Sequence, residues 1–132
     1  MPYLHEVRVA DADIDNLGHA SNLAYLRWVQ EAALAHSSSV GFPEGTYLAR
    51  GQAWVVRRHE IEYVRPALPG DTLTVETRVA NMKAANSERL TRILRGNELL
   101  CRATTDWVYI HLARARPIRI PEDVKGAFPL EP

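Results

Sequence analysis

The 132-residue sequence is short of several features that mark large classes of protein. It has a single cysteine, Cys101, which excludes an intrachain disulfide and suits a reducing cytoplasm. No stretch approaches the roughly 18 apolar residues that a membrane helix needs, and no basic and then apolar leader opens the chain. We therefore expect a cytoplasmic protein that does not insert into a membrane.

The chain also lacks an excess of charge of either sign. It has 16 basic and 16 acidic residues, for a net charge of zero. Because nucleic-acid-binding proteins usually carry a basic excess, we expect no nucleic-acid partner. The hydrophobic share of 46% and the charged share of 24% are typical of a globular protein, and the length predicts one domain over residues 1–132.

Several catalytic and ligand-binding motifs are absent as well. The sequence contains no G-x-S-x-G elbow, no glycine-rich phosphate loop, and no zinc-ligand spacing among its scattered histidines. Asp11, Asp13 and Asp15 form a run that invites comparison with a calcium loop. However, Asn16 and Asn22 stand where such a loop needs a glycine and a glutamate. We therefore expect no metal and no other cofactor.

The clearest pattern that is present is an amphipathic helix after a polar turn. Ser21 is a good N-cap residue, and apolar residues then recur at spacings of three and four, which predicts about 16 helical residues before the breaker Gly41. The apolar positions are Tyr25, Trp28, Val29, Ala32 and Ala33. Residues 43–50 are expected to add a further helical turn or a lid.

The remainder of the chain is predicted to form strands. They are expected at residues 4–10, before the helix, and at 53–64, 72–79, 88–95 and 98–110 after it, with Gly96-Asn97 as a hairpin turn. The tail from Arg116 is expected to run along a sheet edge, where its two prolines are tolerated. One helix and one antiparallel sheet bury their apolar faces by packing together, which predicts an α+β fold. An unpaired edge strand favours a dimer formed by sheet extension.

Residues 13–25, D-I-D-N-L-G-H-A-S-N-L-A-Y, resemble the D-x-x-G-H-x-N-N-x-x-Y signature of hotdog-fold acyl-CoA thioesterases, the 4-hydroxybenzoyl-CoA thioesterase-like family. The segments Y-V-R-P and G-D-T-L resemble the family's Y-x-R-P and G-D-x-L elements, and the likeness covers nearly the whole chain. It implies a five-stranded antiparallel sheet wrapped around one long central helix. It also implies a homodimer or a dimer of dimers with its active sites at the dimer interface.

The resemblance assigns roles to five residues. It implies that Asp15 is the catalytic carboxylate and His19 the signature histidine, with Gly18, Asn22 and Tyr25 helping to bind the substrate. The implied reaction hydrolyses an acyl-CoA or acyl-carrier-protein thioester to a free acid and a thiol. Asp15 would either attack the carbonyl or activate water, and backbone N–H groups at the helix start would hold the oxyanion.

Other interpretations stay open at this point. Asp15 could simply cap a turn, and His19 could orient Asp15, contact the thioester or only bond across the turn. Ala20-Ser21 stands where many relatives have Val-Asn, so one amide side chain is missing beside the site. A hydratase or dehydratase acting on enoyl- or hydroxyacyl-CoA and a non-catalytic acyl-binding module are the alternative functions.

We expect several further residues to have structural rather than catalytic roles. We interpret Cys101 as a packing residue, and we expect three aromatic residues in the core. These are Trp54, Trp107 and Tyr109. Some of these aromatic residues could instead line a pocket between helix and sheet. Five basic residues could meet the phosphates of CoA, but each alone is better explained as a solvated strand residue. These are Arg57, Arg58, Arg65, Lys83 and Arg89.

Overall fold

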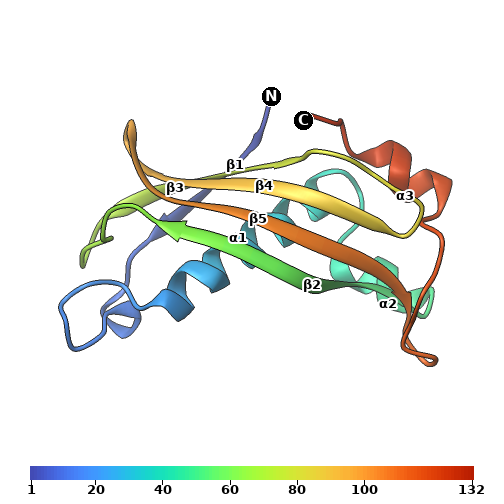
Figure 1. Cartoon of the computed structure of the whole chain (residues 1–132), viewed down its shortest axis with the longest axis horizontal. Helices are drawn as coiled ribbons and strands as arrows, with labels where there is room; N and C mark the ends of the chain where they lie inside the picture. The colour runs from blue at the N-terminus through green and yellow to red at the C-terminus, as the bar shows by residue number, and fades with distance from the viewer.

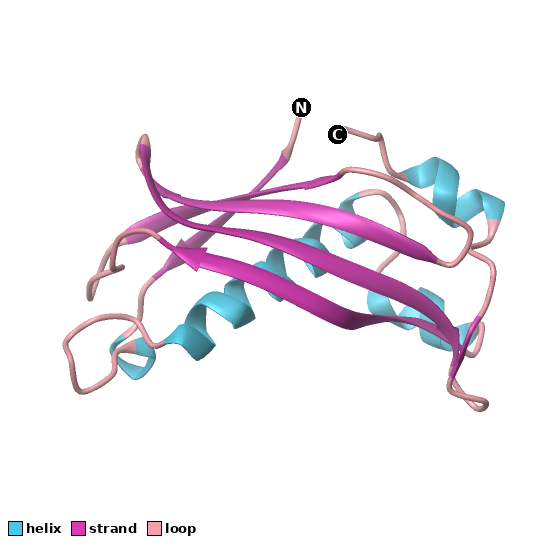
Figure 2. Ribbon diagram, in the orientation of Figure 1, coloured by secondary structure: helices cyan, strands magenta, loops and turns pink.

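The computed structural model describes residues 1–132 and shows a curved antiparallel sheet wrapped around one long helix (Figures 1 and 2). The α+β prediction is therefore confirmed. The elements are β1 (Tyr3–Arg8), the 3-10 turn η1 (Asp11–Asp13), α1 (Asn22–Ser39), α2 (Glu44–Ala49), β2 (Gln52–Tyr63), β3 (Thr72–Val79), β4 (Asn86–Arg95), β5 (Glu98–His111), β6 (Arg116–Pro117) and α3 (Glu122–Ala127). None of the helices is long and apolar enough to cross a membrane.

The sheet has the strand order β1-β3-β4-β5-β2, and every neighbouring pair is antiparallel. The two-residue strand β6 pairs with the end of β5. Strands β1 and β2 each have only one neighbour, so both edges of the sheet carry unpaired backbone groups. A bulge between Val56 and Arg58 interrupts the register of β2 against β5, and such bulges bend a strand locally.

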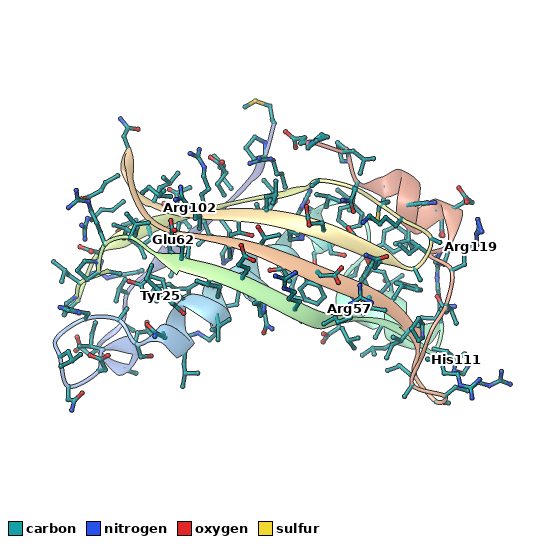
Figure 3. The ribbon with its side chains drawn as sticks, in the orientation of Figure 1. Tyr25, Arg57, Glu62, Arg102, His111 and Arg119 are labelled. Carbon is teal, nitrogen blue, oxygen red and sulfur yellow. The ribbon has the colours of Figure 1, made fainter.

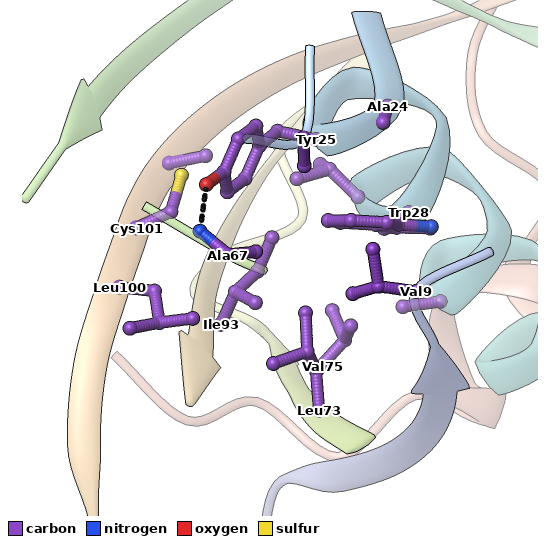
Figure 4. Close-up of a cluster of buried hydrophobic side chains, with 14 residues drawn as sticks. Val9, Ala24, Tyr25, Trp28, Ala67, Leu73, Val75, Ile93, Leu100 and Cys101 are labelled. Carbon is purple, nitrogen blue, oxygen red and sulfur yellow. Dashed lines mark hydrogen bonds between the residues drawn. The ribbon is translucent and has the colours of Figure 1, made fainter. Parts of the chain in front are cut away.

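The main core lies between the first half of α1 and the sheet (Figure 4). Tyr25 and Trp28 of α1 pack there against strand residues, and the hydroxyl of Tyr25 accepts a hydrogen bond of 2.8 Å from the backbone N–H of Ala67. Cys101 is fully buried in this core, as expected of a packing residue. Burial raises the pKa of its thiol to about 12, so the side chain stays neutral.

A second core lies at the other end of α1, beneath α2 and α3. The expectation that the C-terminal tail runs along a sheet edge is confirmed for Arg116–Pro117, which pair with β5, but it is wrong for residues 122–127, which form a helix. Pro121 precedes that helix, acidic residues fill its first turn and Lys125 its last, as the helix dipole favours. Val124 and Phe128 are buried against the sheet end, which fixes the helix in place.

The sheet face that points away from α1 is charged. Arg92 of β4 pairs with Glu76 of β3, and Arg102 of β5 pairs with Glu62 of β2, the two labelled side by side in Figure 3. Exposed pairs of this kind add little stability, typically about 0–1 kcal/mol each. The apolar face and the helix lie on the opposite side, where the candidate site is found.

Candidate functional site

Asp15 lies in a tight turn directly before α1. Its backbone N–H donates to the carbonyl of His19 at 2.8 Å, and its own carbonyl accepts from the N–H of Gly18 at 3.1 Å. Its carboxylate oxygen Oδ1 accepts from the N–H of Leu17 at 2.9 Å. Gly18 adopts a φ of +82°, a left-handed conformation that favours glycine. The turn therefore holds a half-exposed carboxylate in a defined place.

The turn leads straight into the helix start. Ser21 caps α1, and its Oγ accepts from the N–H of Ala24 at 3.3 Å, as expected from the sequence. The backbone N–H groups of Asn22 and Leu23 have no hydrogen-bond partner within the chain. Such groups carry the positive end of the helix dipole. Residues 15–23 thus combine a fixed carboxylate with a helix start that has free donors. Groups of these two kinds can attack a carbonyl and stabilise its developing negative charge.

Asp13 anchors the loop before Asp15, a structural role that the sequence did not reveal. It is buried, and its carboxylate accepts from the N–H of Ala10 at 2.9 Å and from Arg27 Nη2 at 2.5 Å. Burial alone would raise its pKa, but the bonds from Arg27 and Ala10 and the charge of Arg27 outweigh that effect and lower the pKa. Its carbonyl also accepts from the N–H of Ser21 at 2.8 Å. The ion pair therefore ties the loop before Asp15 to α1.

The other predicted site residues are placed differently from one another. The side chains of His19 and Asn22 are exposed and make no hydrogen bond within the chain, so they are free to meet a ligand. Tyr25, by contrast, is buried in the core against Trp28 and Tyr63, with its hydroxyl occupied by Ala67. The structure thus gathers four of the five residues at the turn and helix start and sets Tyr25 behind them.

A cavity of about 300 Å³ lies near the other end of α1, between that helix, α2 and the sheet. Twelve of its seventeen lining residues are hydrophobic. The α1 residues that line it begin at Gln30, about 12 Å along the helix from Asn22 at 1.5 Å per residue. None of the five predicted site residues lines it. Leu34 and Leu48 are 45% and 48% exposed, which places them at its mouth.

Arg89 lies at the buried floor of this cavity, and the prediction of a solvated strand residue is wrong for it. It is only 6% exposed, and its Nη1 donates to His36 Nδ1 at 2.9 Å and to Thr77 Oγ1 at 3.0 Å. The alternation of β4 turns Arg89 inward, whereas Arg92, three residues later, points outward. Burial, with the Arg89 charge, lowers the pKa of His36 to about 4, so His36 is a neutral acceptor.

The three aromatic strand residues were expected either in the core or at a pocket, and the structure has examples of both. Trp54 and Trp107 line the cavity, whereas Tyr109 is fully buried in the second core. The indole N–H of Trp107 is buried without a partner.

No group of three or more His, Cys, Asp or Glu side chains converges as metal ligands would. In particular, Asp13 and Asp15 bind protein donors instead.

The chain matches the profile of the thioesterase-like superfamily over residues 9–128. It is 32% identical over 123 residues to the acyl-CoA thioesterase YbgC of Haemophilus influenzae, covering 92% of this chain and 90% of that protein. It is 34% identical over 114 residues to the chloroplastic dodecanoyl-[acyl-carrier-protein] hydrolase of Cinnamomum camphora, covering 80% of this chain and 30% of that protein. The structure of a 1,4-dihydroxy-2-naphthoyl-CoA thioesterase from Synechocystis superposes with a TM-score of 0.88 at 25% identity, covering 96% and 95% of the two chains.

Proposed function

The chain belongs to the thioesterase-like superfamily, and on that basis we propose that it hydrolyses acyl-CoA or acyl-carrier-protein thioesters at the site around Asp15. One observation carries the proposal. A half-exposed carboxylate is fixed by a tight turn immediately before a helix whose first N–H groups are free. A thioester carbonyl needs such a base or nucleophile on one side and donors for its oxygen on the other.

The reaction follows from these groups. The Asp15 carboxylate either takes a proton from water, whose oxygen bonds to the acyl carbon, or forms that bond itself to give an anhydride that water then cleaves. The N–H groups of Asn22 and Leu23 stabilise the oxyanion that develops. The carbon–sulfur bond then breaks, and the thiolate leaves and is protonated. His19 is free to contact the thioester, and Gly18 permits the turn.

Tyr25 supports the same site from the core. Its hydroxyl bonds to Ala67 N–H, and the carbonyl of Ala67 accepts from the N–H of Ala20 in the turn at 3.0 Å. We assign Tyr25 the part of a positioning residue that holds the turn through Ala67. Its contribution to substrate binding is therefore indirect.

The acyl group is proposed to enter the cavity of a second copy of the chain. Asp15 precedes α1, whereas the cavity lies beside the later turns of the same helix. A two-fold axis beside β2 would set two α1 helices antiparallel and bring each helix start to the partner's cavity. The open edge of β2 and the exposed Leu34, Leu48 and Val55 support this homodimer.

The test is release of free thiol from a panel of short, long and aromatic acyl-CoAs and from acyl-carrier protein. Asp15→Asn should lower kcat about 100-fold or more, because it removes the base or nucleophile. Asp11→Asn is the matched control, since Asp11 is an exposed acid of the same loop. Near-normal turnover by the Asp15 variant would overturn the assignment.

The same assay separates the alternative functions. A hydratase or dehydratase would change the enoyl or hydroxyacyl group and leave the thioester intact, so no thiol would appear. A non-catalytic acyl-binding module would bind acyl-CoA without any release, and Asp15→Asn would not alter that binding. Either result would replace the hydrolase proposal.

A further inference from the structure

We propose that the floor of the cavity binds a carboxylate at the far end of the acyl group, so that the preferred substrates are thioesters of short dicarboxylic acids. The inference rests on the proposed function, because it takes the cavity as the acyl site. It deepens that function by naming the chemical class of the acyl group.

The first support is a buried guanidinium with unused donors. Only Nη1 of Arg89 is engaged by the chain, through His36 and Thr77. Its Nε and Nη2 make no hydrogen bond within the protein, although the residue lines the cavity and is 94% buried. A guanidinium presents its N–H groups as a planar fork that matches the two oxygens of a carboxylate.

The second support is that this charge has no counter-ion. Eight other arginines form ion pairs with carboxylates within 4.0 Å, and every one of them is more exposed than Arg89. They are Arg27, Arg50, Arg57, Arg58, Arg65, Arg92, Arg95 and Arg102. Burying an unpaired charge is costly, and a buried charge is normally paired. His36 supplies no negative charge, because an imidazole is either neutral or cationic. An anionic ligand would complete the site.

The shape of the cavity sets where that anion lies. Leu34 and Leu48 at the mouth are about half exposed, whereas Arg89 and Phe128 at the floor are buried. A thioester carbonyl held at the mouth, where the proposed partner's Asp15 arrives, leaves the far end of the acyl group against Arg89. The volume of about 300 Å³ is at the small end for ligand pockets, which favours a short chain.

The walls between mouth and floor suit a methylene chain. They are apolar and aromatic, and include Phe42, Trp54 and Val79. The cavity therefore combines an apolar passage with the unused donors of Arg89. Glu44 is the one carboxylate among the lining residues; it is exposed at the start of α2 and forms no ion pair with Arg89.

The experiment compares glutaryl-CoA with hexanoyl-CoA, an uncharged acyl group of similar length. We measure the ratio of the two kcat/KM values for the wild type and for Arg89→Met. The wild type should prefer glutaryl-CoA, and Arg89→Met should lower the ratio about 10- to 100-fold, the usual range for a hydrogen bond to a charged group. Arg92→Met, on the outer face of the same strand, is the matched control and should keep the ratio.

Two further measurements make the result decisive. Arg89→Lys keeps the positive charge but loses the planar guanidinium, so it should retain only part of the preference for glutaryl-CoA. This variant replaces Arg89→Met in the test if the methionine variant does not fold. Calorimetric Kd values for the intact thioesters test the carboxylate site even if no thioester is hydrolysed. In that case only the proposed function fails.

Three results would overturn the inference. The first is a wild-type ratio at or below one, in kinetics and in binding. The second is an equal loss for both thioesters in the Arg89 variants, which would assign Arg89 a purely structural part. The third is tighter binding of 4-hydroxybenzoyl-CoA than of glutaryl-CoA, which would show that the floor selects a neutral hydroxyl group.

Discussion

At the scale of single residues, the hydroxyl of Tyr25 links the main core, through Ala67, to the turn that holds Asp15. Tyr25→Phe removes the acceptor of the buried Ala67 N–H. An unsatisfied buried donor costs about 1–3 kcal/mol, so the free energy of unfolding should fall by that amount in urea titrations. Tyr63→Phe is the control, because Tyr63 is 42% exposed and its hydroxyl has no partner in the chain. An equal loss in both variants would contradict this account.

Gly18 gives a second prediction at this scale. Its φ of +82° is one that side chains with a Cβ rarely adopt, so Gly18→Ala should destabilise the fold by about 1 kcal/mol and slow thiol release as the turn shifts. Gly45 lies within α2 with open space around it and no positive φ. Gly45→Ala should therefore be neutral or stabilising. Unfolding measurements that rank the two variants in reverse would refute the turn assignment.

Single residues also show how far the sequence alone could go. Ser21 was identifiable as an N-cap because its hydroxyl precedes an apolar repeat, and the structure confirms it. The inward orientation of Arg89 was not identifiable, because the inner face of β4 carries three polar residues and only one buried apolar residue, Ile93. Asp13 was also missed, since its partner Arg27 is 14 residues away and only the folded loop joins them.

At the scale of elements, the end of α1 is tied to β4 by a neutral histidine. The pKa of His36 is about 4 instead of the ordinary 6.5, because burial and next the Arg89 charge disfavour the imidazolium. The unfolded chain therefore binds a proton between pH 6.5 and about 4 that the folded chain does not. The free energy of unfolding should fall as the pH is lowered through this window, by at most about 1.4 kcal/mol per pH unit.

The variant His36→Gln checks this prediction, because glutamine keeps an acceptor for Arg89 but does not titrate. Its unfolding free energy should vary less with pH over the same window. Burial also lowers the pKa of His59, so some slope should remain in the variant. An unchanged slope would show that His36 does not carry the effect.

Elements with a regular hydrophobic period were predictable, and those without one were not. The repeat from Tyr25 predicts α1, and the alternation in residues 72–79 predicts β3, both of which the structure contains. The six-residue helix α3 has too few positions to establish a period, and its two prolines before residue 122 point to an edge segment instead. Packing of α3 against Tyr109 and the end of the sheet stabilises this helix, and the local sequence does not reveal such a tertiary contact.

At the scale of the whole molecule, the open edge of β2 predicts the assembly. Val55 is an exposed apolar residue on that edge, and Val55→Lys should shift the chain from dimer to monomer in sedimentation experiments and lower thiol release. Leu4→Lys is the control, because Leu4 is exposed on β1 at the opposite edge. A wild-type monomer, or a dimer lost only in the Leu4 variant, would contradict the proposed arrangement.

The most direct test of the proposed shared site mixes two variants that are each expected to be inactive. Asp15→Asn keeps the cavity, and Ala33→Trp fills the cavity but keeps the acid. If one chain's carboxylate acts on a thioester in the partner's cavity, a mixed dimer contains one intact site. Refolding the two variants together in equal amounts should then restore about a quarter of the wild-type thiol release, since random pairing makes half of the dimers mixed. A mixture that forms dimers but stays as inactive as its components would contradict the account.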